Sequence, residues 1–372
     1  MNEQATRFTE KVLRKLGSLY GSYGYSRYKM SKFEEYDLYA RNKDFLISDS
    51  VITFTDTNGK LMALKPDVTL SIVKNSVDTQ KTLQKVYYNE NVYRVTKGTQ
   101  SFKEIAQTGL ECLGEIDSYS ICEVLNLAVE SLQCISGDCI LEVSHLGLLS
   151  SVLDAVGMDA ECKASAWKLI GEKNIHELSA LCASAGISDE NLALLKDLVS
   201  TTGTPEQVLP KLKSQLAGLV NTDVIDRICQ ITGALDGAAA QILRIDFSLV
   251  NDLRYYNGFV FKGFVGGLPA AVLSGGQYDK LMKKLGRKAG AIGFAVYMDM
   301  LERLEKEENS RDVDVVLLYD QTASVEQISQ QVKALTAQGN RVLAQPNKPA
   351  GVRYGKLLKL QSGEVEVLED NA

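Results

Sequence analysis

Four short stretches of the sequence contain residue types that bind small polar molecules. Asp67 and Glu111 supply carboxylates, which can bind an ammonium group, and Gln107 supplies an amide. Tyrosines and glycines follow near residues 255 and 275, where glycines let a ligand approach the backbone closely. Each type also has an ordinary structural role. The alternative interpretation of Asp67 is a helix cap without a binding role. For Glu111 it is a solvated strand residue, and for Gly275-Gly276 it is a simple turn.

The cysteines and histidines are poorly placed for metal binding or nucleophilic chemistry. The seven cysteines lie between Cys112 and Cys229 without a C-x-x-C pair, and the two histidines are His145 and His176. A zinc site needs such ligands at close spacing, so we expect no metal and no cofactor. An odd number of cysteines without close pairs predicts reduced, buried thiols in a cytoplasmic protein.

The segments that must position the polar residues mix strands and helices, which predicts an α+β fold. Residues 5–23 predict a helix with one apolar face, because Phe8, Val12, Leu16 and Tyr20 recur every four residues. Residues 51–65 predict a hairpin around an Asp-Thr-Asn-Gly turn. The other expected core elements are strands at 83–95, 102–114, 139–144, 241–250, 255–267 and 268–276, helices at 68–75, 118–136 and 278–286, and a strand running into a helix at 290–308.

Two regions differ in character from this core. From Ser151 to about Asp236 the helical periodicity, with glycines near helix ends, predicts a helical insert. The charged stretch EKEENSRD predicts a linker, and the β-α-β pattern beyond it predicts a small α/β unit. The expected division is a first core part at 1–150, a helical insert at 151–237, a second core part at 238–308 and a small C-terminal α/β domain at 309–372.

The composition excludes several classes of protein. Hydrophobic residues make up 45% and charged residues 24% of the 372 residues, which is typical of a globular chain and not of a disordered one. The sequence contains no apolar run long enough to cross a membrane, and its first residues do not resemble a secretory signal. The net charge of −6 lacks the basic footprint of a general nucleic-acid binder.

Five blocks in a fixed order carry a family resemblance. They are LKPDVT, the strand–loop–strand with VYR and AQTGLECLG, then NDLRYYNGFVF, LSGGQYDKL and GFAVYMDMLERL. Together they resemble histidyl-tRNA synthetase, and more closely its paralogs, the regulatory subunits of ATP phosphoribosyltransferase, over about residues 1–310. The resemblance implies a class II aminoacyl-tRNA synthetase-like fold: an antiparallel sheet core with flanking helices, the helical insert and the small C-terminal α/β domain.

The resemblance also implies a pocket for histidine. The family's acidic residue after the proline corresponds to Asp67, with Thr69 following, and its glutamine and acid on the later strand correspond to Gln107 and Glu111. Arg94 takes the position of the arginine that contacts ATP in the second motif. The remaining candidates are Tyr255, Tyr256, Gly275, Gly276 and Tyr278; alternation along a strand puts Tyr255 and Tyr256 on opposite sides, one of them in the core.

Several synthetase residues are replaced in this chain. Asn251 and Met300 stand where the synthetase has arginines that face the phosphates of ATP, and Thr96 replaces its second-motif glutamate. One such contact contributes about 3 kcal/mol or more to transition-state stabilisation, so two losses leave little synthetase activity. Arg303, one turn beyond Met300, is expected to be an exposed helix charge. In the pocket, Asp67 is shorter than the synthetase's glutamate and Arg254 replaces an aspartate.

The sequence therefore predicts a regulatory subunit of ATP phosphoribosyltransferase without catalysis of its own. The resemblance implies that its partner is the short catalytic subunit, which it activates for the first step of histidine biosynthesis and makes sensitive to inhibition by histidine. It also implies binding of free histidine and a self-dimer with contacts around residues 24–48, without tRNA or membrane partners. The alternatives are an active histidyl-tRNA synthetase and a free-standing histidine sensor.

Overall fold

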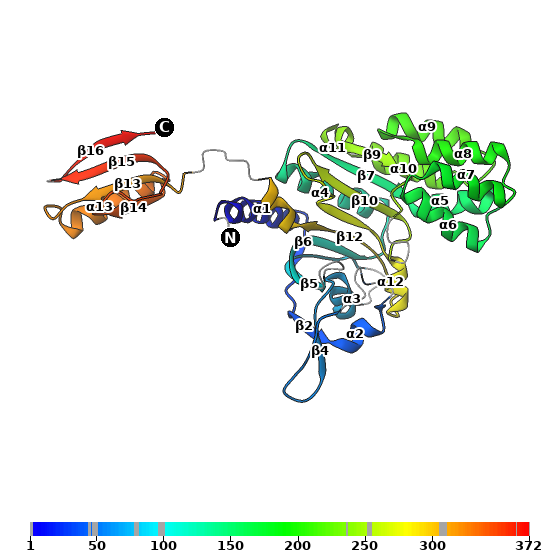
Figure 1. Ribbon diagram of the computed structural model, residues 1–372, viewed down its shortest axis with the longest axis horizontal. Helices are drawn as coiled ribbons and strands as arrows, with labels where there is room; N and C mark the ends of the chain where they lie inside the picture. Colours follow the sequence, from blue (N-terminus) through cyan, green and yellow to red (C-terminus); the bar gives the residue numbers. More distant parts are fainter. Residues whose placement is uncertain are drawn as a thin grey trace. The chain divides into compact units, whose positions relative to one another are not determined.

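A computed structural model describes residues 3–43, 46, 51–77, 82–95, 101–235, 237–250, 255–304, 311–361 and 363–371 (Figure 1). The chain forms two compact units, Met1–Leu304 and Glu305–Ala372. The expected linker falls almost wholly outside the described residues, as do Thr96, Asn251 and Arg254. Within the described residues, no helix is both long and apolar enough to cross a bilayer.

The first unit is built on a mostly antiparallel sheet. Its described strands follow the order β1-β5-β6-β12-β11-β10-β7-β9-β8, and only β1–β5 and β7–β9 pair in parallel. The long antiparallel pair of β5 and β6 confirms the two strands predicted on either side of the polar loop. The strands are β1 (Ser26–Arg27), β5 (Gln84–Val95), β6 (Phe102–Gly114), β7 (Cys139–His145), β8 (Thr202–Gly203), β9 (Leu243–Asp246), β10 (Phe259–Val265), β11 (Leu273–Gln277) and β12 (Gly290–Tyr297).

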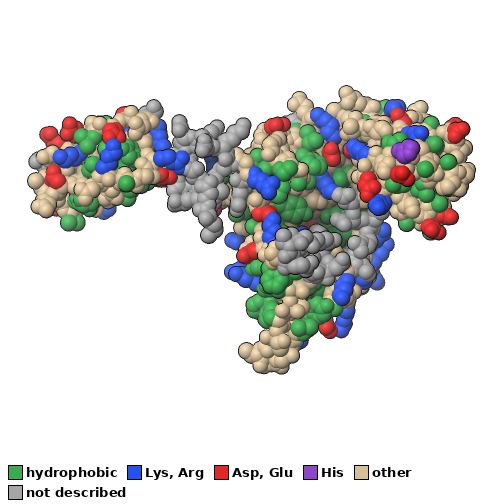
Figure 2. Space-filling model, viewed as in Figure 1, with side chains coloured by type: hydrophobic (Ala, Val, Ile, Leu, Met, Phe, Trp, Pro, Cys, Tyr) green, Lys and Arg blue, Asp and Glu red, His purple; other side chains and the backbone are tan. Residues whose placement is uncertain are grey.

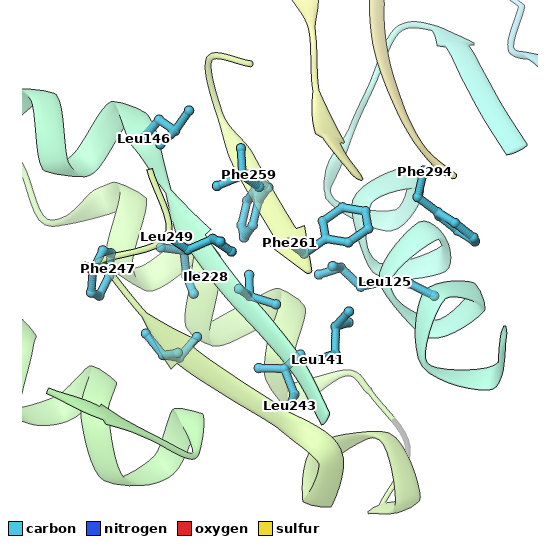
Figure 3. Close-up of a cluster of buried hydrophobic side chains, with 14 of the residues drawn as sticks. Leu125, Leu141, Leu146, Ile228, Leu243, Phe247, Leu249, Phe259, Phe261 and Phe294 are labelled. Carbon is cyan, nitrogen blue, oxygen red and sulfur yellow. The ribbon is translucent and has the colours of Figure 1, made fainter. Parts of the chain in front are cut away.

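One face of this sheet packs on helices α1 (Glu3–Ser22) and α4 (Ser118–Ile135). Val12, Leu16 and Tyr20 of α1 are buried against the sheet, which confirms the predicted apolar face. Asp117 caps α4 by accepting the Ser120 N–H at 2.8 Å. In the close-up of this core, Leu125 of α4 lies among side chains of the strands: Leu141, Leu243, Phe259, Phe261 and Phe294 (Figure 3).

The helical segment after β7 shares this core and is not a separate body. Helices gather beside the β7–β9–β10 end of the sheet (Figure 1), and their apolar side chains, such as Val152, Leu198 and Ile228, belong to the same buried cluster as the strands. The finer division of the first unit into core parts and insert stays a prediction. The helices are α5 (Leu146–Ala155), α6 (Ala160–Gly171), α7 (Ile175–Ser184), α8 (Asp189–Ser200), α9 (Pro205–Leu216), α10 (Asp223–Gly233) and α11 (Gly237–Ile242).

The opposite face of the sheet carries a second, smaller core. A three-stranded sheet, β2 (Phe33–Glu35), β4 (Leu61–Leu64) and β3 (Thr53–Thr55), contains the predicted hairpin. The short helices α2 (Tyr36–Ala40), α3 (Thr69–Asn75) and α12 (Asp279–Lys284) pack beside it. Alternation along β12 divides the two cores, because Ile292 and Phe294 enter the first and Ala291 the second.

The structure corrects several predicted boundaries. β8 is a strand inside the segment predicted to be helical, and with two residues it is too short to show a period. The strand predicted at 241–250 is shorter in the structure: only β9 (Leu243–Asp246) is strand, residues 241–242 belong to the end of α11, and residues 247–250 lie outside helix and strand. The helix predicted after β12 is a 3-10 helix, Met298–Arg303, within the described residues. The seven cysteines are free, and three of them, Cys134, Cys162 and Cys229, are only half-buried.

The second unit is a four-stranded sheet with one helix in its described part. The strand order is β14-β13-β15-β16, and β16 pairs antiparallel at one edge. This matches the β-α-β pattern of the sequence with further strands added. The elements are β13 (Val313–Tyr319), α13 (Val325–Ala337), β14 (Val342–Gln345), β15 (Tyr354–Gln361) and β16 (Glu364–Asp370).

Candidate functional site

Eight of the ten predicted site residues line one pocket on the face of the sheet opposite α4. The pocket encloses about 520 Å³ of space between atoms, part of it open to solvent. Gly275 and Gly276 are not among its lining residues, although the neighbouring Ser274 is. The predicted residues that meet there are Asp67, Thr69, Arg94, Gln107, Glu111, Tyr255, Tyr256 and Tyr278; Val68, Tyr88, Ser274, Gly293, Phe294, Ala295 and Tyr297 complete the lining.

Strand register explains how residues far apart in the sequence meet. Gln107 and Glu111 point to the same face of β6, and the residues directly opposite them on β12 are Tyr297 and Gly293. On the other side of β6, Tyr88 of β5 is opposite Gly109. A Cβ at Gly109 would come within 2.7 Å of the Tyr88 hydroxyl, so only glycine leaves room for that ring.

Glu111 is the most deeply buried acid of the pocket. Its side chain accepts hydrogen bonds from Thr69 Oγ1 at 2.6 Å and from Tyr278 Oη at 2.5 Å, and the residue is 2% exposed. Burial raises the pKa of Glu111 to about 8, although both hydrogen bonds oppose the rise. Glu111 is therefore mostly protonated at neutral pH, and a cation bound beside it would favour loss of that proton.

Asp67 caps a helix and also lines the pocket. Its Oδ1 accepts the Leu70 N–H at 2.8 Å, so it caps the first turn of α3, and it also lines the pocket. Burial raises the pKa of Asp67, opposed by the Leu70 N–H and by the charge of Arg94. Arg94 Nε donates to the Pro66 carbonyl at 3.2 Å, which ties strand β5 to the segment that carries Asp67.

Tyrosines form much of the pocket wall. The prediction that Tyr255 and Tyr256 face opposite sides of a strand is wrong, because both line the pocket. Their ring centroids lie 4.8 Å apart. Both residues precede β10, so the alternation of side chains along a strand does not apply to them. The ring centroid of Tyr278 lies 5.7 Å from that of Tyr255. Burial raises the pKa values of Tyr255 and Tyr278, so these phenols stay neutral donors.

The model of the family described as histidyl-tRNA synthetase matches residues 1–301. The chain belongs to the histidyl-tRNA synthetase family. Its curated relatives include proteins named ATP phosphoribosyltransferase regulatory subunit. The one from Oceanobacillus iheyensis is 25% identical over 78% of this chain and 72% of the relative, and the one from Caldanaerobacter subterraneus is 29% identical over 84% and 83%. A histidine–tRNA ligase from Methanocaldococcus jannaschii is 28% identical over 82% and 74%.

Solved structures show the same fold. A protein from Bacillus halodurans, described as an ATP phosphoribosyltransferase regulatory subunit/histidyl-tRNA synthetase, has a TM-score of 0.77 at 22% identity, covering 95% of this chain and 94% of that one. A chain of an ATP phosphoribosyltransferase complex from Thermotoga maritima has a TM-score of 0.61 at 20% identity, covering 77% and 96%. The class II synthetase-like fold expected from the sequence is confirmed.

The position at which the synthetase has an ATP-facing arginine carries an apolar side chain in this chain. Met300, at the position of an ATP-facing arginine, is partly buried against the core of the first unit and does not line the pocket. Arg303 is exposed, as expected. The lining residues include no histidine or cysteine, and the described residues contain no group of three or more His, Cys, Asp or Glu side chains that could hold a metal.

Sequence reasoning missed two of the tyrosines in the wall, Tyr88 and Tyr297. The signal for Tyr88 was present, because it lies on the same face of β5 as Arg94, six residues earlier along an alternating strand. Tyr297 lies directly opposite Gln107, and that pairing depends on a register between strands far apart in the sequence. Only a structure supplies such a register.

Gly293 leaves the space that Glu111 occupies. A Cβ at Gly293 would lie 1.9 Å from Glu111 Oε2 and 2.4 Å from the Leu110 carbonyl, so Gly293→Ala should lower the free energy of unfolding by about 1–3 kcal/mol. Urea unfolding measures this change. The control is Gly233→Ala at the end of α10, where a Cβ meets nothing within 4 Å. Equal stability of the two variants would contradict the tight contact.

Glu111 gives stability a pH dependence of definite sign. Its pKa is about 8 in the folded chain against 4.5 ordinarily, so between these values the folded chain keeps a proton that the unfolded chain loses. The free energy of unfolding of the wild type should therefore fall, relative to Glu111→Gln, as the pH rises from about 4.5 to about 8. Urea unfolding of both proteins across this window tests it. Both proteins contain Asp67, so its titration cancels in the comparison. Parallel curves of unfolding free energy against pH for the two proteins would contradict a protonated Glu111.

Proposed function

We propose that this chain is a regulatory subunit of ATP phosphoribosyltransferase, without catalysis of its own. The observation that carries the proposal is a family core in which the acidic pocket is kept while Met300 replaces an arginine that faces ATP. The names of the curated relatives support this over an active synthetase or a free-standing sensor. The chain would act in histidine biosynthesis, in the cytoplasm.

The ligand proposed for the pocket is free histidine. Two buried carboxylates, Asp67 and Glu111, suit the ammonium group, and the guanidinium of Arg94 suits a carboxylate. The amide of Gln107 and the neutral phenols can hydrogen-bond an imidazole ring. The pocket would thus recognise both charged ends and the side chain of one amino acid.

The proposed partner is the short catalytic subunit. The Thermotoga maritima structure, which shares the fold, is described as an ATP phosphoribosyltransferase complex, and this supports an assembly of the same kind. Histidine would inhibit by binding two states of that assembly with different affinities, with a coupling free energy of typically about 1–3 kcal/mol. The chain itself would transfer no group.

Self-association is proposed through the first unit, around residues 24–48. Hydrophobic side chains are exposed at the surface of this part of the chain (Figure 2), and on the small sheet of β2, β3 and β4 they include two aromatic residues. Phe33 is 48% and Phe54 is 38% exposed, and their rings meet edge to face at 5.6 Å. Exposed apolar groups of this kind are typical of protein contacts.

tRNA is not proposed as a ligand, because the net charge is −6 and β16 exposes Glu364 and Glu366.

Mixing with a short catalytic subunit tests the regulatory role. The full chain should raise the rate of phosphoribosyl transfer to ATP, and histidine should lower the rate of the mixture. No activation on mixing would contradict the proposal. The control is histidine-dependent exchange of pyrophosphate into ATP by this chain alone, which should be absent. Its presence would favour an active synthetase.

Calorimetry tests the proposed ligand through Glu111. An ammonium group beside Glu111 lowers its raised pKa, so histidine binding near pH 7.5 should release protons, and the heat should depend on the ionisation enthalpy of the buffer. Glu111→Gln should bind more weakly and show less buffer dependence. Glu104→Gln, an exposed acid on the same strand, should match the wild type. Identical buffer dependence in all three proteins would exclude Glu111 from the ligand's surroundings.

A further inference from the structure

A lysine and a glutamate next to the pocket form a buried ion pair that ligand contact does not explain. Lys65 Nζ lies 2.5 Å from Glu90 Oε2, with the lysine side chain 0% and the glutamate side chain 13% exposed. Neither residue lines the pocket. Removing both charges from water is costly, and an apolar pair of similar volume is often no less stable. Stability alone is therefore a weak reason for this pair.

The pair joins the two segments that carry Asp67 and Arg94, two charged groups of the pocket. Lys65 precedes Pro66 and Asp67, whereas Glu90 lies on β5 on the same face as Arg94. Two further hydrogen bonds join the same segments: the Lys65 carbonyl accepts the Tyr93 N–H at 2.9 Å, and the Pro66 carbonyl accepts Arg94 Nε–H at 3.2 Å. The side-chain pair completes a three-point attachment between them.

A third segment is attached at the same place. The Lys65 N–H donates to the Lys32 carbonyl at 3.1 Å, and Glu90 Oε1 accepts the Met30 N–H at 3.5 Å. Met30 and Lys32 belong to the stretch that connects β1 to β2. The ion pair therefore lies where this connection, the Asp67 segment and β5 converge.

We propose that Lys65 and Glu90 are positioning residues of the pocket. Their ion pair holds the Lys65-Pro66-Asp67 segment against β5, and this sets where the Asp67 carboxylate lies relative to the Arg94 guanidinium. A ligand with a cationic and an anionic end needs these two groups at a fixed separation. The inference rests on the proposed function, which places histidine in the pocket.

Four variants of the full chain test this role by calorimetry with histidine and by thermal unfolding. Lys65→Met and Glu90→Gln each leave one buried partner alone, so both should lower the Tm. The double variant Lys65→Met/Glu90→Gln removes both charges and should regain most of the Tm. Lys65→Arg keeps the charge and should stay close to the wild type in affinity.

The affinity of the double variant decides the matter. If the pair positions the pocket, this variant should regain most of the wild-type Tm yet bind histidine roughly two- to thirtyfold more weakly, the range of coupling carried through packed contacts. Wild-type affinity in the double variant would overturn the inference. Lys60→Met is the matched control, because Lys60 pairs with Glu35 on the exposed surface and should leave the affinity unchanged. If the wild type itself does not bind histidine, the proposed ligand fails instead.

Discussion

The burial of Glu111 is the constraint around which the pocket is built. Among the described residues, its hydrogen-bond partners are a hydroxyl and a phenol, not a basic side chain. Four elements must meet to satisfy it: Thr69 from α3, Tyr278 from the start of α12, the acid itself on β6, and Gly293 on β12, where any side chain would collide with it. A buried acid with neutral partners is costly as an anion, so burial favours the protonated form of Glu111.

The contrast between Glu111 and Glu90 shows how the fold treats its buried acids. Glu90 receives a lysine from within the chain and serves to join segments. Among the described residues, Glu111 receives hydrogen bonds only from neutral donors, Thr69 and Tyr278. The same side-chain chemistry thus yields a buried ion pair at one position and a buried acid bonded to neutral groups at the other. The difference lies in which neighbours the sequence supplies.

The sequence predicted those parts of the fold and site that depend on local pattern or motif. The apolar face of α1 follows from residues spaced one turn apart, and the β5–β6 pair follows from two long runs around a polar loop. The cap role of Asp67 follows from its position between Pro66 and the helix, whereas its place in the pocket lining was expected only from the family resemblance. The directions in which Tyr255 and Tyr256 point could not be predicted, because they depend on where β10 begins. Strand boundaries are predicted only to within a few residues, and here β10 begins after both tyrosines. Tyr297 depends on a long-range register, and β8 on tertiary pairing with β9.

The retained and altered positions together favour recognition over reaction. Chemistry on ATP needs fixed positive charge where the phosphates develop negative charge, and Met300 supplies none there. Recognition of an amino acid needs only that its ends and side chain meet complementary groups at the right separation, and in the proposed histidine site Asp67, Glu111 and Arg94 would supply groups for the two charged ends. A ligand bound in such a site can alter an assembly only by its difference in affinity between two states. If a second state of the assembly admitted water to Glu111, burial would no longer raise its pKa, and the two states would then differ in their affinity for an ammonium group.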